Sequence, residues 1–247
     1  MIPYTRRKSI LELMHLKEIV TIEEIINRTN VSDATVRRDL KTLASEGHIE
    51  LLSGGAAKLI INVAQKSLSE KIDLSKEEKK KIAMYAATRV NDGQFIFMGP
   101  GTTENYMIEH LEGKNITVAT NGAFHIEKLL KYNISCILIG GTVLTDIAVV
   151  VGTTTINQIK GMNFDKCFVG AAGITIQNGV SSSNCEVAQM NKAAIEQSKE
   201  AFLIADSTKF GQNSRYKYAD IDDERLTIIT TNNCDLSLYG DKVIAVE

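Results

Sequence analysis

Tryptophan is absent from the 247-residue sequence, and only two prolines and four cysteines occur in it. The cysteines are widely spaced and form no C-x-x-C pair, so neither a disulfide framework nor a cysteine metal cluster is expected. Cys136 and Cys167 lie in apolar stretches, where small buried side chains are the ordinary interpretation. The four histidines are scattered without ligand spacing. We therefore expect no metal and no other cofactor.

Long apolar runs and a strong charge imbalance are lacking too. No run approaches the roughly 20 residues that span a bilayer, and the start, MIPYTRRKSILELM, has no signal-peptide apolar region. The formal net charge of −2 excludes an overall attraction to nucleic acid or membrane, though not a local basic face. Hydrophobic residues make up 44% of the chain, which is enough for a core. A cytoplasmic globular protein without a membrane partner is expected.

Three helices followed by a hairpin are predicted near the start of the chain. Apolar spacing predicts a first helix over residues 5–17. Thr21 begins a capping box for a second helix, and Ser32 caps a third. Two β-prone runs then flank Gly54-Gly55, as in a hairpin. This order is that of a small winged helix-turn-helix domain, which we expect over residues 1–58.

The remainder of the chain predicts an α/β domain. Residues 59–75 are weakly periodic and are expected to be a linker, whereas strand-type and helix-type segments alternate over residues 76–247. Alternation predicts a mostly parallel sheet with helices on both faces. Ligands bind such sheets beyond the carboxyl ends of the strands. The polar loops predicted at those ends are GPGTT (99–103), TNG (120–122), GG (140–141), AAG (171–173) and DSTKFG (206–211).

The third helix, SDATVRRDLKTLASEG, carries the strongest functional signal. With Val36, Leu40 and Leu43 turned inward, hydroxyl and basic side chains occupy the turns where a recognition helix contacts DNA. Arginine bonds bidentately to guanine, and threonine can bond a base or contact the thymine methyl group. An isolated Arg-Arg pair is usually only part of an ordinary solvated surface. Here the pair lies near the start of the third helix of a three-helix-plus-wing pattern, which favours DNA binding. The DNA-binding residues we expect are Ser32 as the cap, Thr35, Arg37, Arg38 and Lys41, with Arg6 and Arg7 before the first helix.

Basic residues are not in large excess in this region. Residues 1–60 carry nine Lys and Arg against eight Asp and Glu. Binding must therefore depend on where the basic side chains lie, and one copy would bind weakly. Since dimers or tetramers on repeated half-sites strengthen binding, we expect a homo-oligomer with operator DNA as its partner.

The segment IFMGPGTTENYM, residues 96–107, joins an apolar strand to a helix through a Gly-Pro-Gly turn. Backbone N–H groups and threonine hydroxyls converge there, which suits a phosphate. A purely structural turn is the alternative, because GxGTT is short. Lys209 and the other polar loops favour the phosphate.

The stretch VSDATVRRDLKTLASEGHIELLSGGA resembles the signature of DeoR-type bacterial transcription regulators, with its RRDL helix and Gly-Gly-Ala wing. The likeness continues through EEKKKIA (77–83), ATNG (119–122), LIGG (138–141) and DSTKFG (206–211), and covers almost the whole chain. It implies a repressor whose C-terminal domain looks like ribose 5-phosphate isomerase and senses a phosphorylated sugar. The effector-binding residues that the resemblance implies are Gly101, Thr102, Thr103, Asn121, Gly140, Gly141 and Lys209.

Two positions depart from the family pattern. Members usually carry basic residues just before the wing glycines, where this chain has Glu50-Leu51-Leu52. Many carry an aspartate where Gly99 stands, so a different effector subgroup is implied. GPGTT resembles the form in lactose-pathway repressors that respond to tagatose 6-phosphate, which makes that compound a candidate effector.

A sugar-phosphate isomerase with an accessory DNA-binding domain is the alternative function. Such an isomerase needs a carboxylate base and a group that stabilises the enediolate, for which Glu104, Glu186, Asp206 and Lys209 are candidates. Acids at helix starts are equally explained by the helix dipole. Ligand-controlled DNA binding is sufficient to explain a DNA-binding domain joined to a pocket. We therefore expect a sensor, not an enzyme, and no catalytic residues.

Overall fold

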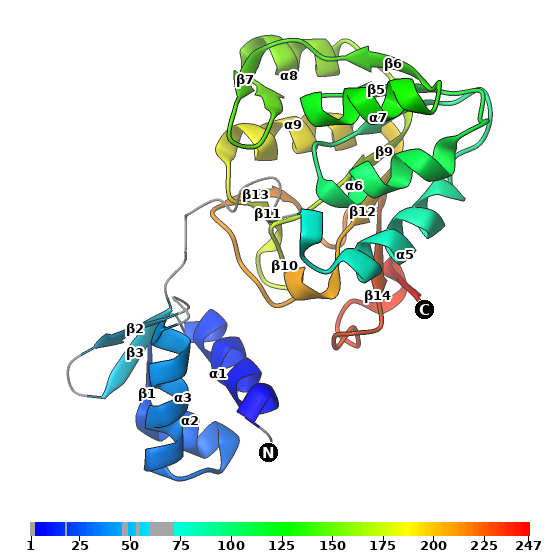
Figure 1. Ribbon diagram of the computed structural model, residues 1–247. Helices are drawn as coiled ribbons and strands as arrows, with labels where there is room; N and C mark the ends of the chain where they lie inside the picture. Colours follow the sequence, from blue (N-terminus) through cyan, green and yellow to red (C-terminus); the bar gives the residue numbers. More distant parts are fainter. Residues whose placement is uncertain (1–2, 18, 46–48, 53–54, 60–71) are drawn as a thin grey trace. The chain divides into compact units, whose positions relative to one another are not determined.

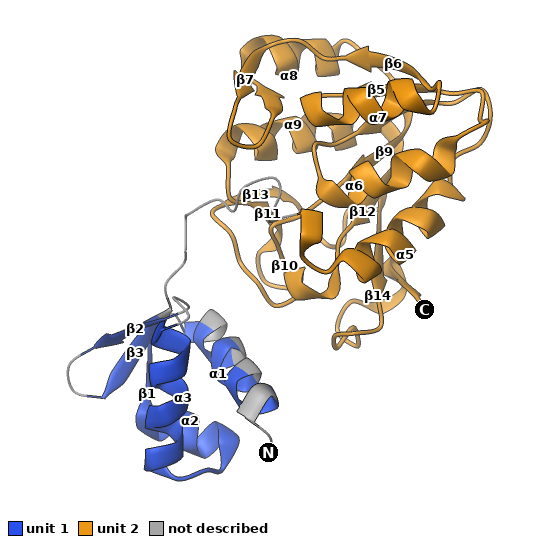
Figure 2. Ribbon diagram, in the orientation of Figure 1, with its two compact units in different colours: residues 1–65 blue, residues 66–247 orange. Residues whose placement is uncertain are grey.

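The computed structural model describes residues 3–17, 19–45, 49–52, 55–59 and 72–247. Contacts within the chain divide it into two units, residues 1–65 and residues 66–247 (Figure 2). Most of the expected linker, residues 60–71, lies outside the described residues. The exact domain boundaries at 58/59 and 75/76 therefore stay predictions.

In the described part of the first unit, three helices and three short strands are present (Figure 1). The first helix begins at Pro3, two residues earlier than predicted. Proline suits the first position of a helix because the N–H groups there have no intrahelical partner, so the N–H that proline lacks removes no hydrogen bond. The elements are α1 (Pro3–Lys17), β1 (Ile19–Thr21), α2 (Ile22–Thr29), α3 (Asp33–Ser45), β2 (Ile49–Leu52) and β3 (Ala56–Leu59).

The boundaries of α2 follow from its sequence. The N–H of Glu24 donates to Thr21 Oγ1 at 3.3 Å, and the N–H of Thr21 donates to Glu24 Oε2 at 2.9 Å, so the predicted capping box is confirmed. Asn30 ends the helix with a left-handed φ of 53°, a conformation that asparagine tolerates better than most residues.

The predicted hairpin is formed by β2 and β3, which pair antiparallel, with Leu51 opposite Ala57. β1 pairs with the other edge of β3, which gives the order β1-β3-β2. Strand β1 was not predicted, since three residues carry too little pattern to indicate a strand.

One hydrophobic core holds the first unit together. α1 contributes Ile10 and Met14, α2 contributes Ile25, and α3 contributes Val36 and Leu43, all at most 2% exposed. Burying each such side chain is worth about 1.5–3 kcal/mol. The apolar stripe of α3 is therefore fixed inward, and its opposite face is fixed toward solvent.

A seven-stranded sheet with every pair parallel forms the centre of the second unit, in the order β15-β14-β12-β9-β4-β5-β6 (Figure 1). The predicted parallel sheet is thereby confirmed. Its strands are β4 (Phe95–Met98), β5 (Thr117–Thr120), β6 (Ser135–Leu138), β9 (Phe164–Val169), β12 (Ser198–Ile204), β14 (Leu226–Thr231) and β15 (Val243–Val246).

Helices cover both faces of this sheet, because its strands are apolar on both sides. Ile96 and Met98 of β4 face a core shared with one set of helices, whereas Phe97 between them faces the other core. The first set is α5 (Lys76–Ala87), α6 (Thr102–Met107), which continues as the short helix η1 (Ile108–Leu111), and α7 (Ile126–Lys131) preceded by η2 (Ala123–His125). The second set is α8 (Thr153–Lys160) and α9 (Cys185–Glu196).

Two small antiparallel sheets lie beside the main one, and the sequence did not predict them. One is the hairpin of β7 (Thr142–Leu144) and β8 (Val149–Val151). The other has the order β10-β11-β13, made of β10 (Gly173–Thr175), β11 (Gly179–Ser182) and β13 (Tyr216–Ala219). Two further short helices are η3 (Ser207–Lys209) and η4 (Gly240–Lys242). Among the described residues, no helix is long and apolar enough to cross a membrane.

Candidate functional site

The solvent face of α3 carries the predicted basic side chains. Arg37, Arg38 and Lys41 are exposed, and Thr35 is half-buried. Arg37 Nε donates to Asp33 Oδ1 at 2.6 Å, but both side chains are more than half exposed. Such a surface pair is worth little, so the Arg37 guanidinium can exchange its partner for a phosphate at small cost.

Ser32 stands at the start of α3, as predicted. Its carbonyl accepts hydrogen bonds from the N–H groups of Thr35 and Val36, both at 3.0 Å. Its hydroxyl lies 3.0 Å from the Thr35 hydroxyl, so the two side chains form one polar pair at the beginning of the helix.

Arg6 does not belong to this exposed surface, contrary to expectation. Its side chain is buried and makes a bidentate ion pair with Asp39 of α3, including a 3.1 Å bond from Nη2 to Oδ1. The pair joins α1 to α3 through the aspartate of the RRDL motif. Sequence reasoning missed it because the partners are 33 residues apart. Arg7, the other predicted contact on α1, is half-buried.

The wing has little net charge. Glu50 on β2 lies directly opposite Lys58 on β3 in the antiparallel register. Opposite charges in such cross-strand positions stabilise the pairing. The departure from the family pattern at Glu50 is therefore matched by a lysine on the neighbouring strand.

In the second unit, the order of the sheet identifies the position of the candidate ligand site. From β4 the chain proceeds outward to β5 and β6, and then returns to β9 on the other side of β4. Ligands of open parallel sheets bind where the strand order reverses in this way, beyond the carboxyl ends of the strands. Gly99 follows β4 and Gly170 follows β9, and the N–H of Gly99 donates to the carbonyl of Phe168 at 2.8 Å. The GPGTT turn thus lies at the reversal.

A buried histidine holds this turn in place. His125 Nε2 lies 3.1 Å from the carbonyl of Gly101, and its Nδ1 lies 3.1 Å from Thr120 Oγ1. Because the Gly101 carbonyl can only accept, Nε2 carries the proton and Nδ1 accepts from Thr120. The Thr120 hydroxyl in turn accepts from the N–H of Gly122 at 3.0 Å. The ends of β4 and β5 are thereby connected.

His125 is neutral in this position. Burial lowers its pKa to about 4, and the bond to Gly101 offsets only part of that effect. Sequence reasoning found only that the histidines lack metal-ligand spacing, because the role of His125 depends on contacts with Gly101, 24 residues away.

The predicted effector residues at or next to the turn follow the neighbouring strands β4 and β5. Thr103 is buried and Thr102 is half-buried in the first turn of α6. Asn121, after β5, is fully buried and donates through Nδ2 to the carbonyl of Val150 at 3.0 Å. Within the described part of the chain, its Oδ1 has no hydrogen-bond partner.

The other predicted effector residues lie farther from the turn. Gly140 and Gly141 follow β6, two strands from β4 on one side, and Lys209 follows β12, two strands away on the other side. Two strand spacings amount to about 10 Å. Gly141 also has a structural role, because its φ is 156° and a Cβ there would lie 2.6 Å from the Val151 carbonyl. Gly101–Thr103 and Asn121 follow the adjacent strands β4 and β5, and the others are spread along the same edge.

Glu78 of α5 holds the DSTKFG loop, a role that sequence reasoning missed. Its carboxylate accepts from the Ser207 N–H at 3.0 Å, the Ser207 hydroxyl at 3.1 Å and the Thr231 hydroxyl at 2.6 Å. Burial raises the pKa of Glu78, but these hydrogen bonds outweigh burial and leave the pKa below its usual value. The EEKKKIA segment, which contains Glu78, is thereby connected to the loop.

The carboxylates proposed for an isomerase are not gathered at one point. Asp206 Oδ1 accepts from the N–H of Thr208 at 3.1 Å, which orders its own turn, and Lys209 Nζ lies 3.7 Å from Asp206 Oδ2. Glu186 is half-buried in the first turn of α9. Glu104 is buried beside the GPGTT turn. In the described residues, no group of three His, Cys, Asp or Glu side chains could hold a metal ion.

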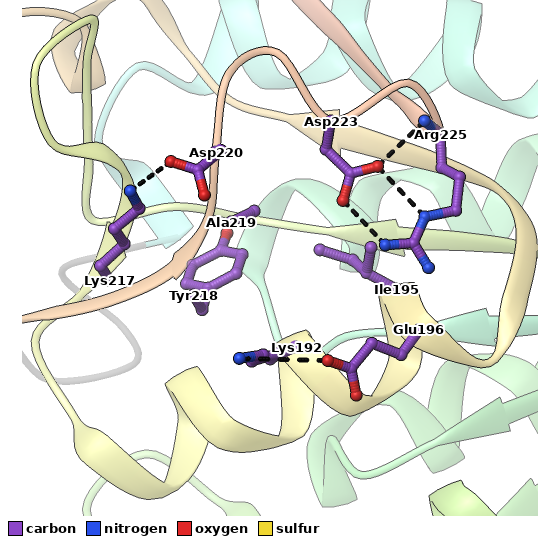
Figure 3. Close-up of a pocket in the computed structure, with 9 residues that line it drawn as sticks. All are labelled: Lys192, Ile195, Glu196, Lys217, Tyr218, Ala219, Asp220, Asp223 and Arg225. Carbon is purple, nitrogen blue, oxygen red and sulfur yellow. Dashed lines mark hydrogen bonds and ion pairs between the residues drawn. The ribbon is translucent and has the colours of Figure 1, made fainter.

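A cavity of about 270 Å³ lies between α9, β13 and the loop that leads to β14 (Figure 3). Its charged side chains are mutually paired: Lys192 with Glu196, Lys217 with Asp220, and Arg225 with Asp223. Asp223 and Arg225 directly precede β14, so the cavity lies toward the amino ends of the strands. Ligands of parallel sheets bind at the opposite edge, so we place the candidate site at the GPGTT turn despite the size of this cavity.

Known proteins resemble the chain over nearly its full length. The DeoR-like helix-turn-helix domain matches residues 6–60, and the DeoR C terminal sensor domain matches residues 74–232. An uncharacterized HTH-type transcriptional regulator FruR of Bacillus subtilis is 35% identical over 242 residues, covering 97% of this chain and 96% of that protein. A lactose phosphotransferase system repressor of Staphylococcus epidermidis is 31% identical over 238 residues, covering 94% of this chain and 93% of that protein.

Part of the chain is also similar to a solved structure. Ribose 5 phosphate isomerase A from Neisseria gonorrhoeae is 20% identical, with 56% of this chain and 53% of that chain covered, and the TM-score is 0.39. The two domain matches and the full-length relatives place the chain in the DeoR family of helix-turn-helix transcriptional regulators, with a DNA-binding domain followed by a sensor domain.

Proposed function

We propose that this protein is a repressor that binds operator DNA through α3 and releases it when a phosphorylated sugar binds beside the GPGTT turn. The observation that carries the proposal is the two-sided character of α3. Val36, Leu40 and Leu43 are buried, and Arg37, Arg38 and Lys41 are exposed on the opposite side. Side chains in that position on a recognition helix contact base edges and phosphates. Thr35, Ser32 and Arg7 belong to the proposed surface, whereas Arg6 serves the core.

Release of DNA requires the ligand to prefer the conformation that binds DNA poorly. The proposed effector site comprises the GPGTT turn and Asn121, with Lys209 and Gly140-Gly141 at the margins of the same sheet edge. A phosphate at the turn suits the backbone N–H groups and the two threonine hydroxyls. Tagatose 6-phosphate is the first compound to test, since a relative is named a lactose phosphotransferase system repressor.

The DNA-binding part is tested by measuring the DNA affinity of Arg38→Ala by fluorescence anisotropy, with the promoter region of the gene that encodes this protein as the DNA. Loss of one arginine that bonds a base costs about 1–3 kcal/mol, which corresponds to a roughly 10- to 100-fold weaker complex. Arg215→Ala, which removes an exposed arginine of the second unit, is the matched control and should change affinity little. Equal affinity of both variants and the wild type would contradict the assignment of α3.

The sensing part is tested by measuring thermal unfolding with sugar phosphates. A bound compound should raise the unfolding temperature of the second unit, because binding to the folded state alone stabilises it. Thr102→Ala and Lys209→Ala should reduce the increase, while Thr154→Ala, at an exposed threonine of α8, should not. An increase of the same size in all variants would place the ligand elsewhere.

The proposed oligomer follows from the small excess of basic residues in the first unit. A dimer or tetramer that engages several half-sites at once gains affinity without new contacts. Sedimentation equilibrium should therefore show more than one copy per particle. A monomer that binds a single half-site tightly would contradict this part of the proposal.

A further inference from the structure

A carboxyl group with no hydrogen-bond partner is enclosed beside the GPGTT turn. Glu104 is 1% exposed, and among the described residues neither of its oxygens has a hydrogen-bond partner. Three glycines surround it. A Cβ on Gly99 would lie 3.4 Å from Glu104 Oε1, a Cβ on Gly170 would lie 3.2 Å from it, and a Cβ on Gly101 would collide with Oε2. The carboxyl group therefore occupies the space that side chains at the ends of β4 and β9 would need.

Other polar side chains meet at the same point. Tyr218 donates its hydroxyl proton to the carbonyl of Gly170 at 2.7 Å, and Asn191 Nδ2 lies 3.4 Å from the same carbonyl. Asn191 Oδ1 is buried and, within the described part of the chain, has no partner. A buried polar atom without a partner costs free energy, so such atoms commonly mark the position of a bound group. A partner that forms hydrogen bonds with Glu104 and Asn191 would remove that cost.

Two titratable groups interact electrostatically with the Glu104 carboxyl, namely Lys79 of α5 and Tyr218 of β13. His125 of η2 bonds the carbonyl of Gly101 beside it, and Cys167 of β9 interacts with Tyr218. Burial raises the pKa of Glu104 to about 8, although the nearby N–H groups of Glu104 and Gly170 and the charge of Lys79 act in the opposite direction. Burial likewise raises the pKa of Tyr218 and of Cys167, and lowers that of His125. The carboxyl group is therefore neutral at pH 7.

We propose that Glu104 is a ligand-binding residue of the sensor site, which as a neutral acid donates a hydrogen bond to the anionic group of the ligand at the GPGTT turn. This inference rests on the proposed function, namely that a phosphorylated compound binds there. An ionised carboxylate beside a phosphate would repel it, whereas the protonated acid supplies an O–H donor. The bond leaves the proton on Glu104, and no covalent bond forms or breaks.

Proton-linked binding is the measurable consequence. Since the ligand binds the protonated form, its affinity stays constant while Glu104 is protonated and then falls by about tenfold for each pH unit once the acid ionises. The test uses the full chain and inorganic phosphate in titration calorimetry between pH 7 and pH 9.5. Each affinity is referred to the concentration of the phosphate dianion, because inorganic phosphate is still partly a monoanion at pH 7. The expected wild-type profile is flat up to about pH 8 and declines beyond it.

Glu104→Gln keeps a neutral donor and removes the titration, so its affinity should stay flat from pH 7 to pH 9.5. Glu127→Gln, at an exposed position of α7, is the matched control and should keep the wild-type decline. The wild-type profile serves as the test if Glu104→Gln fails to fold. A wild-type affinity that is flat or rises with pH overturns the proposal, as does a Glu104→Gln variant that declines like the wild type.

Failure of the proposed function would look different. If phosphate bound at no pH, the result would contradict the proposed function itself, because no ligand would then bind at the turn. Binding that Thr102→Ala abolishes at pH 7, but that shows no decline above pH 8, would keep the proposed site and overturn only the role of Glu104.

Discussion

At the scale of single residues, Arg6 shows how a tertiary contact reassigns a side chain. Its position in a basic cluster predicts a DNA contact, but Arg6 is only 9% exposed and its guanidinium is bound to Asp39. Asp39 lies within the RRDL motif, so the motif combines an exposed arginine, Arg38, with a buried aspartate. Sequence alone could not separate these roles, because Asp39 is as polar as its exposed neighbours.

Asp39→Ala should therefore destabilise the first unit by about 3 kcal/mol, since it removes the carboxylate from the buried ion pair with Arg6. The double replacement Arg6→Met with Asp39→Leu should recover most of this loss, because it removes both charges together. Urea unfolding followed by circular dichroism measures both effects. A double variant as unstable as Asp39→Ala would show that packing, not the broken ion pair, causes the loss.

His125 predicts a specific dependence of stability on pH. Its pKa is about 4 in the folded chain against 6.5 for an unperturbed histidine, so the unfolded chain binds the proton more readily. The stabilisation is complete above pH 6.5 and is lost as the pH falls toward 4, with a total of about 3 kcal/mol. His125→Gln retains an N–H donor for Gly101 but cannot titrate. Its free energy of unfolding should fall less steeply over that range, and parallel curves would exclude His125 as the cause.

At the scale of elements, strands with uninterrupted apolar runs and helices with regular apolar spacing were predictable, and short strands without such runs were not. The apolar runs of β4, β9 and β12 and the helical spacing of α5 and α9 are typical of a parallel sheet between helices. The strands β7, β10 and β13 have only three or four residues. β13 forms by pairing with a distant segment, as Val180 of β11 pairs with Ala219 of β13, whereas β7 and β10 each pair with the next strand in a short hairpin.

The same limit applies to the candidate site. Its glycines and threonines were visible as a GPGTT motif, but the enclosure of Glu104 by Gly99, Gly101 and Gly170 depends on strands that meet only in the folded sheet. The sequence indicates Glu104 as a candidate carboxylate of an isomerase or as an acid at a helix start, and neither interpretation includes this enclosure.

A separate prediction concerns Gly101 in the GPGTT turn. Gly101→Ala should destabilise the second unit by about 1–3 kcal/mol, because the added Cβ collides with the Glu104 carboxyl although the backbone φ of −94° is ordinary. Adding Glu104→Ala should restore most of the stability. Gly161→Ala is the matched control, since its Cβ would make ordinary contacts at 3.5 Å. Thermal unfolding measures all three, and additive losses in the double variant would contradict the collision.

At the scale of the whole molecule, the hydrophobic clusters of the first unit and of the second unit share no residue among those described. Units with separate cores unfold separately unless a large interface couples them. Calorimetry should therefore resolve two transitions, with Asp39→Ala lowering one and Gly101→Ala lowering the other. A single transition that both substitutions lower equally would contradict this prediction.

The enclosure of Glu104 also restricts the order in which substitutions at the turn can accumulate during evolution. An alanine at position 101 is harmful while the glutamate is present and is tolerated once the glutamate has been replaced, so the order of the two substitutions decides whether the intermediate protein folds well. Position 104 must change first. New side chains at the turn, and with them a new ligand preference, can therefore be acquired only after Glu104 has been replaced.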